Sequence, residues 1–215
     1  MKIEEFFQIA ENEGVVDIED TTIVGDIKLE GKVFRKGIKL LEGNELEGEI
    51  VMRECKFLDD VNLEGGIFYN NVKISGCAFF GDLLIGFLSK KLLIQKTELQ
   101  GGISFVGSSD EQNSGIFLFD NGILGNIDFS GHDIGLAVRI IRCQCHGSLI
   151  LGDAKFEQDL SILESKIKNV ITFQHYDIGS GCEIMGNVFT DDPEIAQLLA
   201  LSKVGVYTNL QKKEK

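Results

Sequence analysis

The large apolar residues of segment 52–85 are separated by gaps that alternate between five and six residues. They are Met52, Phe57, Leu63, Phe68, Ile74, Phe79 and Ile85. An α-helix would bring apolar residues to one face every three or four positions, and a half-buried strand would do so at every second position. Neither period produces the observed gaps, so the segment is an internal repeat of about 11 residues, which is typical of a solenoid.

Each repeat unit starts with a triplet in which two apolar residues flank one other residue. The triplets are Val16/Ile18, Ile27/Leu29, Ile38/Leu40, Ile50/Met52, Val61/Leu63, Val72/Ile74, Leu83/Ile85, Leu92/Ile94, Ile103/Phe105, Ile116/Leu118, Ile127/Phe129, Val138/Ile140, Leu149/Leu151, Leu160/Ile162, Ile171/Phe173 and Cys182/Ile184. A second apolar residue follows each triplet after five or six positions, at Phe57 and Phe79 for example. The pattern predicts short strands that run in the same direction and are separated by tight corners.

The alternation of five and six residues indicates how many sides each coil has. Three sides per coil would stack a long side on a short one at every turn and interrupt the backbone hydrogen bonds. With four sides, a coil closes after about 22 residues, which lies within the usual range of solenoid repeats. Each side then stacks on a side of the same length in the next coil. The sixteen triplets therefore predict an all-β, four-sided parallel β-helix of about eight coils, roughly 40 Å long. Parallel crossovers of this kind are normally right-handed.

Residues 1–14 and 191–215 flank the predicted β-helix, which covers 15–190. Residues 2–12 and 192–203 have the apolar spacing of short helices, and we expect each to cap one end of the rod, because uncovered strand edges recruit other chains. The second helix is apolar around much of its circumference, which is more than capping requires. Its apolar residues predict a homodimer through the C-terminal ends: Ile195, Leu198, Leu199 and Leu201.

The amino-acid sequence of several units resembles that of the pentapeptide-repeat family. Cys55-Lys-Phe57, Cys77-Ala-Phe79 and Ala154-Lys-Phe156 each place a small residue two positions before a central Phe. This resemblance implies a right-handed, four-sided β-helix. Acidic pentapeptide-repeat dimers imitate duplex DNA and bind type II topoisomerases, so the resemblance also implies a DNA mimic as one alternative function.

The phrases Gly25-Asp26-Ile27 and Gly81-Asp82-Leu83 resemble bactofilins, which are polymer-forming β-helical proteins. This second resemblance implies a filament subunit. Bactofilin coils are similar to three-sided ones, and the alternation of five and six residues therefore places this alternative behind the first.

A net charge of −13 argues against direct binding of nucleic acid through phosphates and against an anionic membrane surface. The N-terminal sequence has acidic residues where a signal peptide needs an apolar run, and no stretch approaches the ~18 apolar residues of a membrane span. We therefore expect a cytoplasmic protein that does not span a membrane.

The residues that could carry chemistry fall on repeat positions. All five cysteines occupy inward positions and none forms a Cys-x-x-Cys pair, so we expect buried free thiols and no metal site: Cys55, Cys77, Cys143, Cys145 and Cys182. Asp59, Asp60 and Asp82 form the best acidic cluster, but corners favour Asp for turn reasons alone. We predict neither catalysis nor a cofactor.

Two irregular units lie next to outward apolar residues. The unit between Ile85 and Ile94 is short by two residues, and the one between Phe105 and Leu118 is long by two. Leu93 and Phe117 occupy the middle of triplets on adjacent coils of one face, where a side chain points outward. An exposed apolar pair favours a protein contact. The favoured function is thus a non-enzymatic scaffold that binds a protein partner through Leu93 and Phe117.

Overall fold

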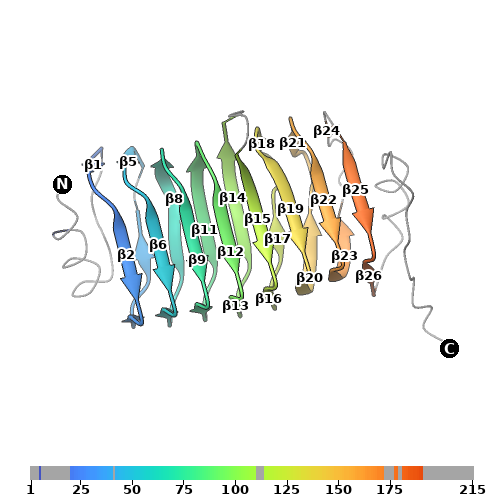
Figure 1. Ribbon diagram of the computed structural model, residues 1–215, viewed down its shortest axis with the longest axis horizontal. Helices are drawn as coiled ribbons and strands as arrows, with labels where there is room; N and C mark the ends of the chain where they lie inside the picture. The colour runs from blue at the N-terminus through green and yellow to red at the C-terminus, as the bar shows by residue number, and fades with distance from the viewer. Residues whose placement is uncertain are drawn as a thin grey trace.

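The computed structural model describes residues 5, 20–40, 42–109, 114–171, 177–178 and 181–190. These residues form a right-handed parallel β-solenoid of about seven turns. Figure 1 shows the coils as short strands stacked side by side along one axis, in chain order. The expected all-β solenoid is confirmed. The predicted capping helices and the predicted dimer residues Ile195, Leu198, Leu199 and Leu201 lie outside the described residues, apart from Glu5.

One strand from each coil contributes to an eight-stranded parallel sheet, which we call the front sheet. Its strands are β2 (Ile27–Glu30), β6 (Ile50–Arg53), β9 (Val72–Ser75), β12 (Leu92–Gln95), β15 (Gly115–Phe119), β19 (Ala137–Ile141), β22 (Leu160–Leu163) and β25 (Cys182–Met185). The register partners of Ile27 continue strand by strand as far as Cys182, so the same position of the coil recurs in every strand of the sheet.

The length of a regular coil agrees with the repeat in the sequence. In most coils, equivalent residues of adjacent coils are 22 positions apart in the chain, as are Cys55 and Cys77, and Ser165 and Asn187. The first described coil has one residue more, since Ile27 pairs with Ile50. The predicted coil length is therefore the rule along the described chain. The triplet Val16/Ile18, which belongs to the first of the eight predicted coils, lies outside the described residues.

The other strands of the described residues form an 18-stranded parallel sheet that bends around the remaining sides. They are β1 (Thr22–Ile23), β3 (Val33–Phe34), β4 (Ile38–Lys39), β5 (Asn44–Leu46), β7 (Lys56–Phe57), β8 (Val61–Phe68), β10 (Ala78–Phe79), β11 (Leu83–Leu88), β13 (Glu98–Leu99), β14 (Ile103–Ser108), β16 (Gly122–Ile123), β17 (Ile127–Asp128), β18 (Asp133–Ile134), β20 (Gln144–Ile150), β21 (Lys155–Phe156), β23 (Lys166–Ile171), β24 (Asp177–Ile178) and β26 (Val188–Phe189).

The registers of this large sheet define three ladders, so that each coil has four sides. One ladder runs from Phe34 through Phe57 and Phe79, a second from Ile38 through Val61 and Leu83, and a third from Ile23 through Leu46 and Phe68. Together with the front sheet they make four parallel ladders per coil. The four-sided prediction is confirmed, and the described coils do not have the three sides of the alternative.

The inward residues of the four ladders form the core. Phe57 lies between Phe34 and Phe79 with ring centroids 5.0 and 4.6 Å apart, and Phe105 stacks on Phe129 at 4.6 Å. Rings repeat at these separations because the coils that carry them are about 4.8 Å apart. Each buried ring contributes roughly 1.5–3 kcal/mol through the area it removes from water.

The triplet Ile171/Phe173 is wrong by one residue. Val170 is the buried partner of Leu149, whereas Ile171 pairs with Ile150 and is half-buried. The register shifts between Cys145 and Ser148, where β20 has one residue more than β23. This side of the coil is therefore one residue shorter than in the regular repeat, although Leu160 and Cys182 are again 22 positions apart. Phe173 lies outside the described residues.

The irregular units also contain inward residues that the repeat pattern did not indicate. Leu88 pairs with Phe68 on one side and Ser108 on the other, and both Leu88 and Ser108 are buried. The short coil separates Cys77 from Thr97 by 20 positions, and the long one separates Thr97 from Asn121 by 24. Together they equal two regular coils, so the later coils return to the original phase.

Replacing Phe57 by Ala tests the stacked core. We expect Phe57→Ala to lower the free energy of unfolding by about 3–5 kcal/mol, because it removes a buried ring between two others and leaves a cavity. Chemical denaturation of both proteins measures the change. The neighbouring Leu58 is 45% exposed, and Leu58→Ala is the matched control, expected to change stability little. Equal losses in the two variants would contradict the stacking assignment.

Candidate interaction surface

The corner that follows the front sheet carries a column of buried residues, which we call the corner column. Its members are Cys55, Cys77, Thr97, Asn121, Cys143, Ser165 and Asn187. Each follows a residue with a left-handed backbone, for example Glu54 at φ 54° and Arg142 at φ 52°. The left-handed residue ends the strand and turns the chain, so that the next side chain points inward.

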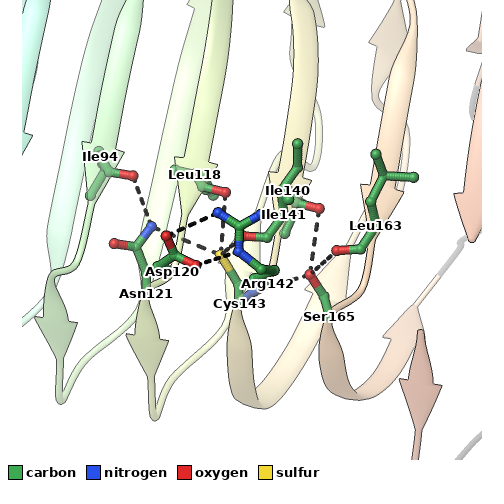
Figure 2. A network of polar contacts seen from close by, with 10 residues as sticks. All are labelled: Ile94, Leu118, Asp120, Asn121, Ile140, Ile141, Arg142, Cys143, Leu163 and Ser165. Atoms are coloured by element: carbon green, nitrogen blue, oxygen red, sulfur yellow. Dashed lines mark hydrogen bonds and ion pairs between the residues drawn. The ribbon is translucent and has the colours of Figure 1, made fainter. Parts of the chain in front are cut away.

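The side chains of the corner column bond one coil to the next. Thr97 N donates to Asn121 Oδ1 at 3.0 Å, Cys143 N to Ser165 Oγ at 3.1 Å, and Ser165 N to Asn187 Oδ1 at 2.7 Å. Figure 2 shows the middle of the column, where Asn121 Nδ2 donates to Ile94 O at 2.9 Å and lies 3.9 Å from Cys143 Sγ. The column therefore satisfies backbone groups that a corner would otherwise leave unpaired inside the rod.

Three of the five cysteines, Cys55, Cys77 and Cys143, belong to the corner column. All five are buried and none forms a disulfide, as predicted. Burial raises the pKa of Cys143 and raises the pKa values of Cys145 and Cys182 to about 11. Cys55 and Cys77 share a hydrogen bond, which lowers the pKa of Cys55 and raises that of Cys77, where burial adds to the effect.

The acidic residues of the predicted cluster bond the backbone at the corner before the second triplet of each coil. Asp60 Oδ1 accepts a hydrogen bond from Asp82 N at 2.8 Å, and Asp82 Oδ1 accepts one from Gly102 N at 2.6 Å. Asp59 Oδ1 accepts one from Asp60 N at 2.9 Å. A Cβ on Gly81 would lie 2.2 Å from Asp60 Oδ1, so glycine is required there for the coils to approach. Each carboxylate thus caps a backbone amide of its corner, which explains the acids without catalysis.

The predicted pair Leu93 and Phe117 is brought together as expected. The two residues are register partners on β12 and β15, and both side chains point outward and are half-buried. The Phe117 ring extends over Gly115, where a Cβ would lie 2.7 Å from the ring. Lys91 Nζ lies 4.7 Å from the ring centroid, and the Arg139 guanidinium carbon lies 5.7 Å from it. One cation comes from the coil before Phe117 and the other from the coil after it, so both help to hold the ring.

A second outward column extends this pair toward the C-terminal end of the front sheet. Phe119 pairs with Ile141, Ile141 with Leu163 and Leu163 with Met185. Phe119, Ile141 and Leu163 are half-buried, Met185 is 40% exposed, and the Phe117 and Phe119 rings are 5.8 Å apart. We call the combined surface the apolar strip: Leu93, Phe117, Phe119, Ile141, Leu163 and Met185.

The triplet pattern alone does not predict the second column. Most front-sheet strands continue for a fourth residue, which points outward again, as in the buried, half-buried, buried, half-buried pattern of β12. The signal was present in the sequence, since an apolar residue follows each of the triplets that end at Leu118, Ile140, Ile162 and Ile184.

Cations gather around the aromatic end of the apolar strip. Within β12, β15 and β19 and their adjoining corner residues lie four cations and one carboxylate, that of Asp120, and Glu164 at the next corner also acts on Arg142. The four cations are Lys91, Lys96, Arg139 and Arg142. Arg142 donates to both oxygens of Asp120, at 2.6 and 3.1 Å, and these bonds lower the pKa of the Asp120 carboxyl. This part of the surface is positive, although the whole chain has a net charge of −13.

Comparison of the chain with protein-family models, with curated proteins and with solved structures gives no match. The fold therefore defines the class, a parallel β-solenoid. In the part of the chain that the structure describes, no group of three or more His, Cys, Asp and Glu could hold a metal ion. No helix among those residues is long and apolar enough to cross a membrane.

Removing the Asn121 side chain tests the corner column. Asn121→Ala leaves the buried Thr97 N–H without its acceptor and removes the side-chain bond to Ile94 C=O, which stays in the ladder between β12 and β15. We expect the free energy of unfolding to fall by about 1–3 kcal/mol, the cost of one unpaired buried group. Thermal and chemical unfolding measure the loss. Asn70 bonds Glu47 O at the surface, so Asn70→Ala is the control and should cost little; similar losses in both would show that the column is dispensable.

Thiol labelling tests the inward assignment of the cysteines. We expect all five thiols to react with an aromatic disulfide reagent after denaturation and almost none to react in the native protein at mildly alkaline pH. Burial blocks access to each sulfur and keeps Cys145 and Cys182, with raised pKa values, protonated at that pH. Absorbance of the released thiolate follows the reaction. Rapid reaction of the native protein would overturn the assignment.

Proposed function

We propose that the protein is a non-enzymatic scaffold whose apolar strip binds a protein partner. The observation that carries this proposal is the change in the outward residues along the front sheet. In the first three coils the two outward columns contain Lys28, Val51, Lys73, Glu30, Arg53 and Ser75. From β12 to β25 the six residues of the apolar strip occupy more than half of the same positions. A contiguous apolar surface with a polar surround is typical of a protein contact.

The use of the polar side chains supports this proposal. The cysteines of the corner column and Asp60 and Asp82 form bonds between coils, and these bonds keep the ladders in register. The outward face of the front sheet is rigid, since each strand there bonds to both neighbours from β6 to β22. A rigid face that presents apolar side chains can bind a partner with little loss of conformational entropy.

Substitution within the apolar strip tests the proposed function. Leu93→Asp and Phe117→Asp each place a carboxylate at the aromatic end of the apolar strip, and we expect each to weaken capture of the natural partner at least about tenfold. Quantitative mass spectrometry of proteins that co-purify from the source cells measures capture by each variant.

Leu84→Asp is the matched control. Leu84 is also the half-buried middle residue of a triplet, but it pairs with Asn62 and Ser104 in the large sheet rather than the front sheet. Capture should survive this change. Capture that is unaffected by Leu93→Asp and Phe117→Asp, or reduced equally by Leu84→Asp, would contradict the proposal.

A further inference from the structure

We infer that the apolar strip receives one short acidic amphipathic helix of a partner protein, lying along the axis of the rod. This inference rests on the proposed function and names the element that the surface accepts. It follows from the area of the apolar strip, from the direction in which its residues repeat and from the charges at its aromatic end.

The area of the apolar strip suits a single element better than a second copy of the chain. The strip crosses the five strands from β12 to β25, which span about 19 Å at ~4.8 Å per strand. Its two columns are about 7 Å apart, so the footprint is on the order of 200 Å², whereas each side of a stable protein interface buries about 800 Å². Two copies would also bring together chains with a net charge of −13 each.

The direction of the apolar strip favours a helix over an extended strand. Backbone groups of β12, β15, β19 and β22 bond to neighbouring coils on both sides, so the face offers side chains and no free backbone edge for strand addition. The columns repeat about every 4.8 Å along the rod, close to the ~5.4 Å pitch of an α-helix. About four turns, roughly 14 residues, therefore match the length of the strip with anchors at i, i+3 or i+4, and i+7.

The charges determine which kind of helix fits. Lys91 and Arg139 hold the Phe117 ring from the coils before and after it. This places one cation beside β12, at the end of the strip, and a second on β19, at its middle strand. Lys96 follows β12 at the adjoining corner. Carboxylates on the flank of a docked helix would meet these cations while its apolar stripe covers Phe117 and Phe119. A basic helix would place like charges together, which costs binding energy.

A peptide selection with the intact protein tests this inference. The probe is a displayed library of helix-forming peptides, each slightly longer than the four turns that the strip accommodates, with random residues on one face and its flanks. We expect the selected peptides to share apolar residues at helical spacing and to carry an excess of Asp and Glu. Fluorescence anisotropy should show at least about a tenfold weaker affinity for Phe117→Ala and for the double variant Lys91→Glu, Arg139→Glu. Leu84→Ala should bind like the native protein.

Charge exchange separates recognition from damage to the fold. A selected peptide with its flanking Glu changed to Lys should bind the Lys91→Glu, Arg139→Glu protein more tightly than it binds the native protein. Circular dichroism of each variant should match that of the native protein, since the changed side chains point outward. Recovery of affinity by the exchanged peptide would support the assigned cations directly.

Several outcomes would overturn the inference. They are failure to select any peptide, selection of basic or non-helical peptides, affinity that is independent of Phe117, and a homodimer in light scattering that Phe117→Asp dissociates. If the natural partner is nevertheless lost in Leu93→Asp and Phe117→Asp, the scaffold function stands and only the helix is wrong. If the partner is retained in both, the proposed function itself fails.

Discussion

The constraint on which the rest of the structure depends is that each position stacks on its own equivalent one coil later. Parallel strands about 4.8 Å apart restrict how far one coil can differ in length from the next, because an uncompensated difference would shift the register of the next ladder. The corner column enforces this spacing with side chains that accept backbone N–H groups from the preceding coil, as Asn121 does for Thr97 and Ser165 for Cys143. The Asp60 and Asp82 carboxylates bond in the opposite direction, because each accepts a hydrogen bond from a backbone N–H of the following coil. Polar side chains thus hold adjacent coils in register at two corners, with the corner column at one and the aspartate carboxylates at the other.

The pair of irregular coils shows how this constraint admits variation. The step of 20 positions from Cys77 to Thr97 is followed at once by one of 24 from Thr97 to Asn121, and the later coils are back in phase. Columns of equivalent residues therefore continue across the disturbance, and Leu93 and Phe117 lie where the two irregular coils meet. Thr97 and Asn121 keep the corner column continuous through the same region. The departure from the repeat and the change of the outward face thus occur in the same part of the rod.

Much of this architecture could be predicted from the sequence because the inward residues are apolar and recur at regular spacing. The alternation of five and six residues was sufficient to predict that each coil has four sides and that Phe57, Phe79 and the five cysteines are buried. Three features of the structure do not follow from the sequence pattern. The register shift after Cys145 moved the inward residue from Ile171 to Val170, Leu88 and Ser108 filled inward positions in units of irregular length, and the corner column proved to be a hydrogen-bonding element rather than a row of merely small residues. A hydrogen bond between coils depends on side-chain orientation at a corner, which a pattern of apolar residues does not encode.

On such a rod the outward face is the part where residues can change without disturbing the ladders. Inward positions must fill a stacked core, and corner positions must satisfy backbone groups, so neither can be altered freely for binding. The front sheet accordingly carries charged residues in its first coils and the apolar strip in its later ones. An apolar residue at an outward position removes less surface from water than it would in the core, so the strip adds little to stability by comparison with Phe57 or Phe129. The proposed function explains its presence by a contact outside the rod. The placement of the Phe117 ring over Gly115, between Lys91 and Arg139, supports this view, because the ring is held in one orientation before any partner arrives.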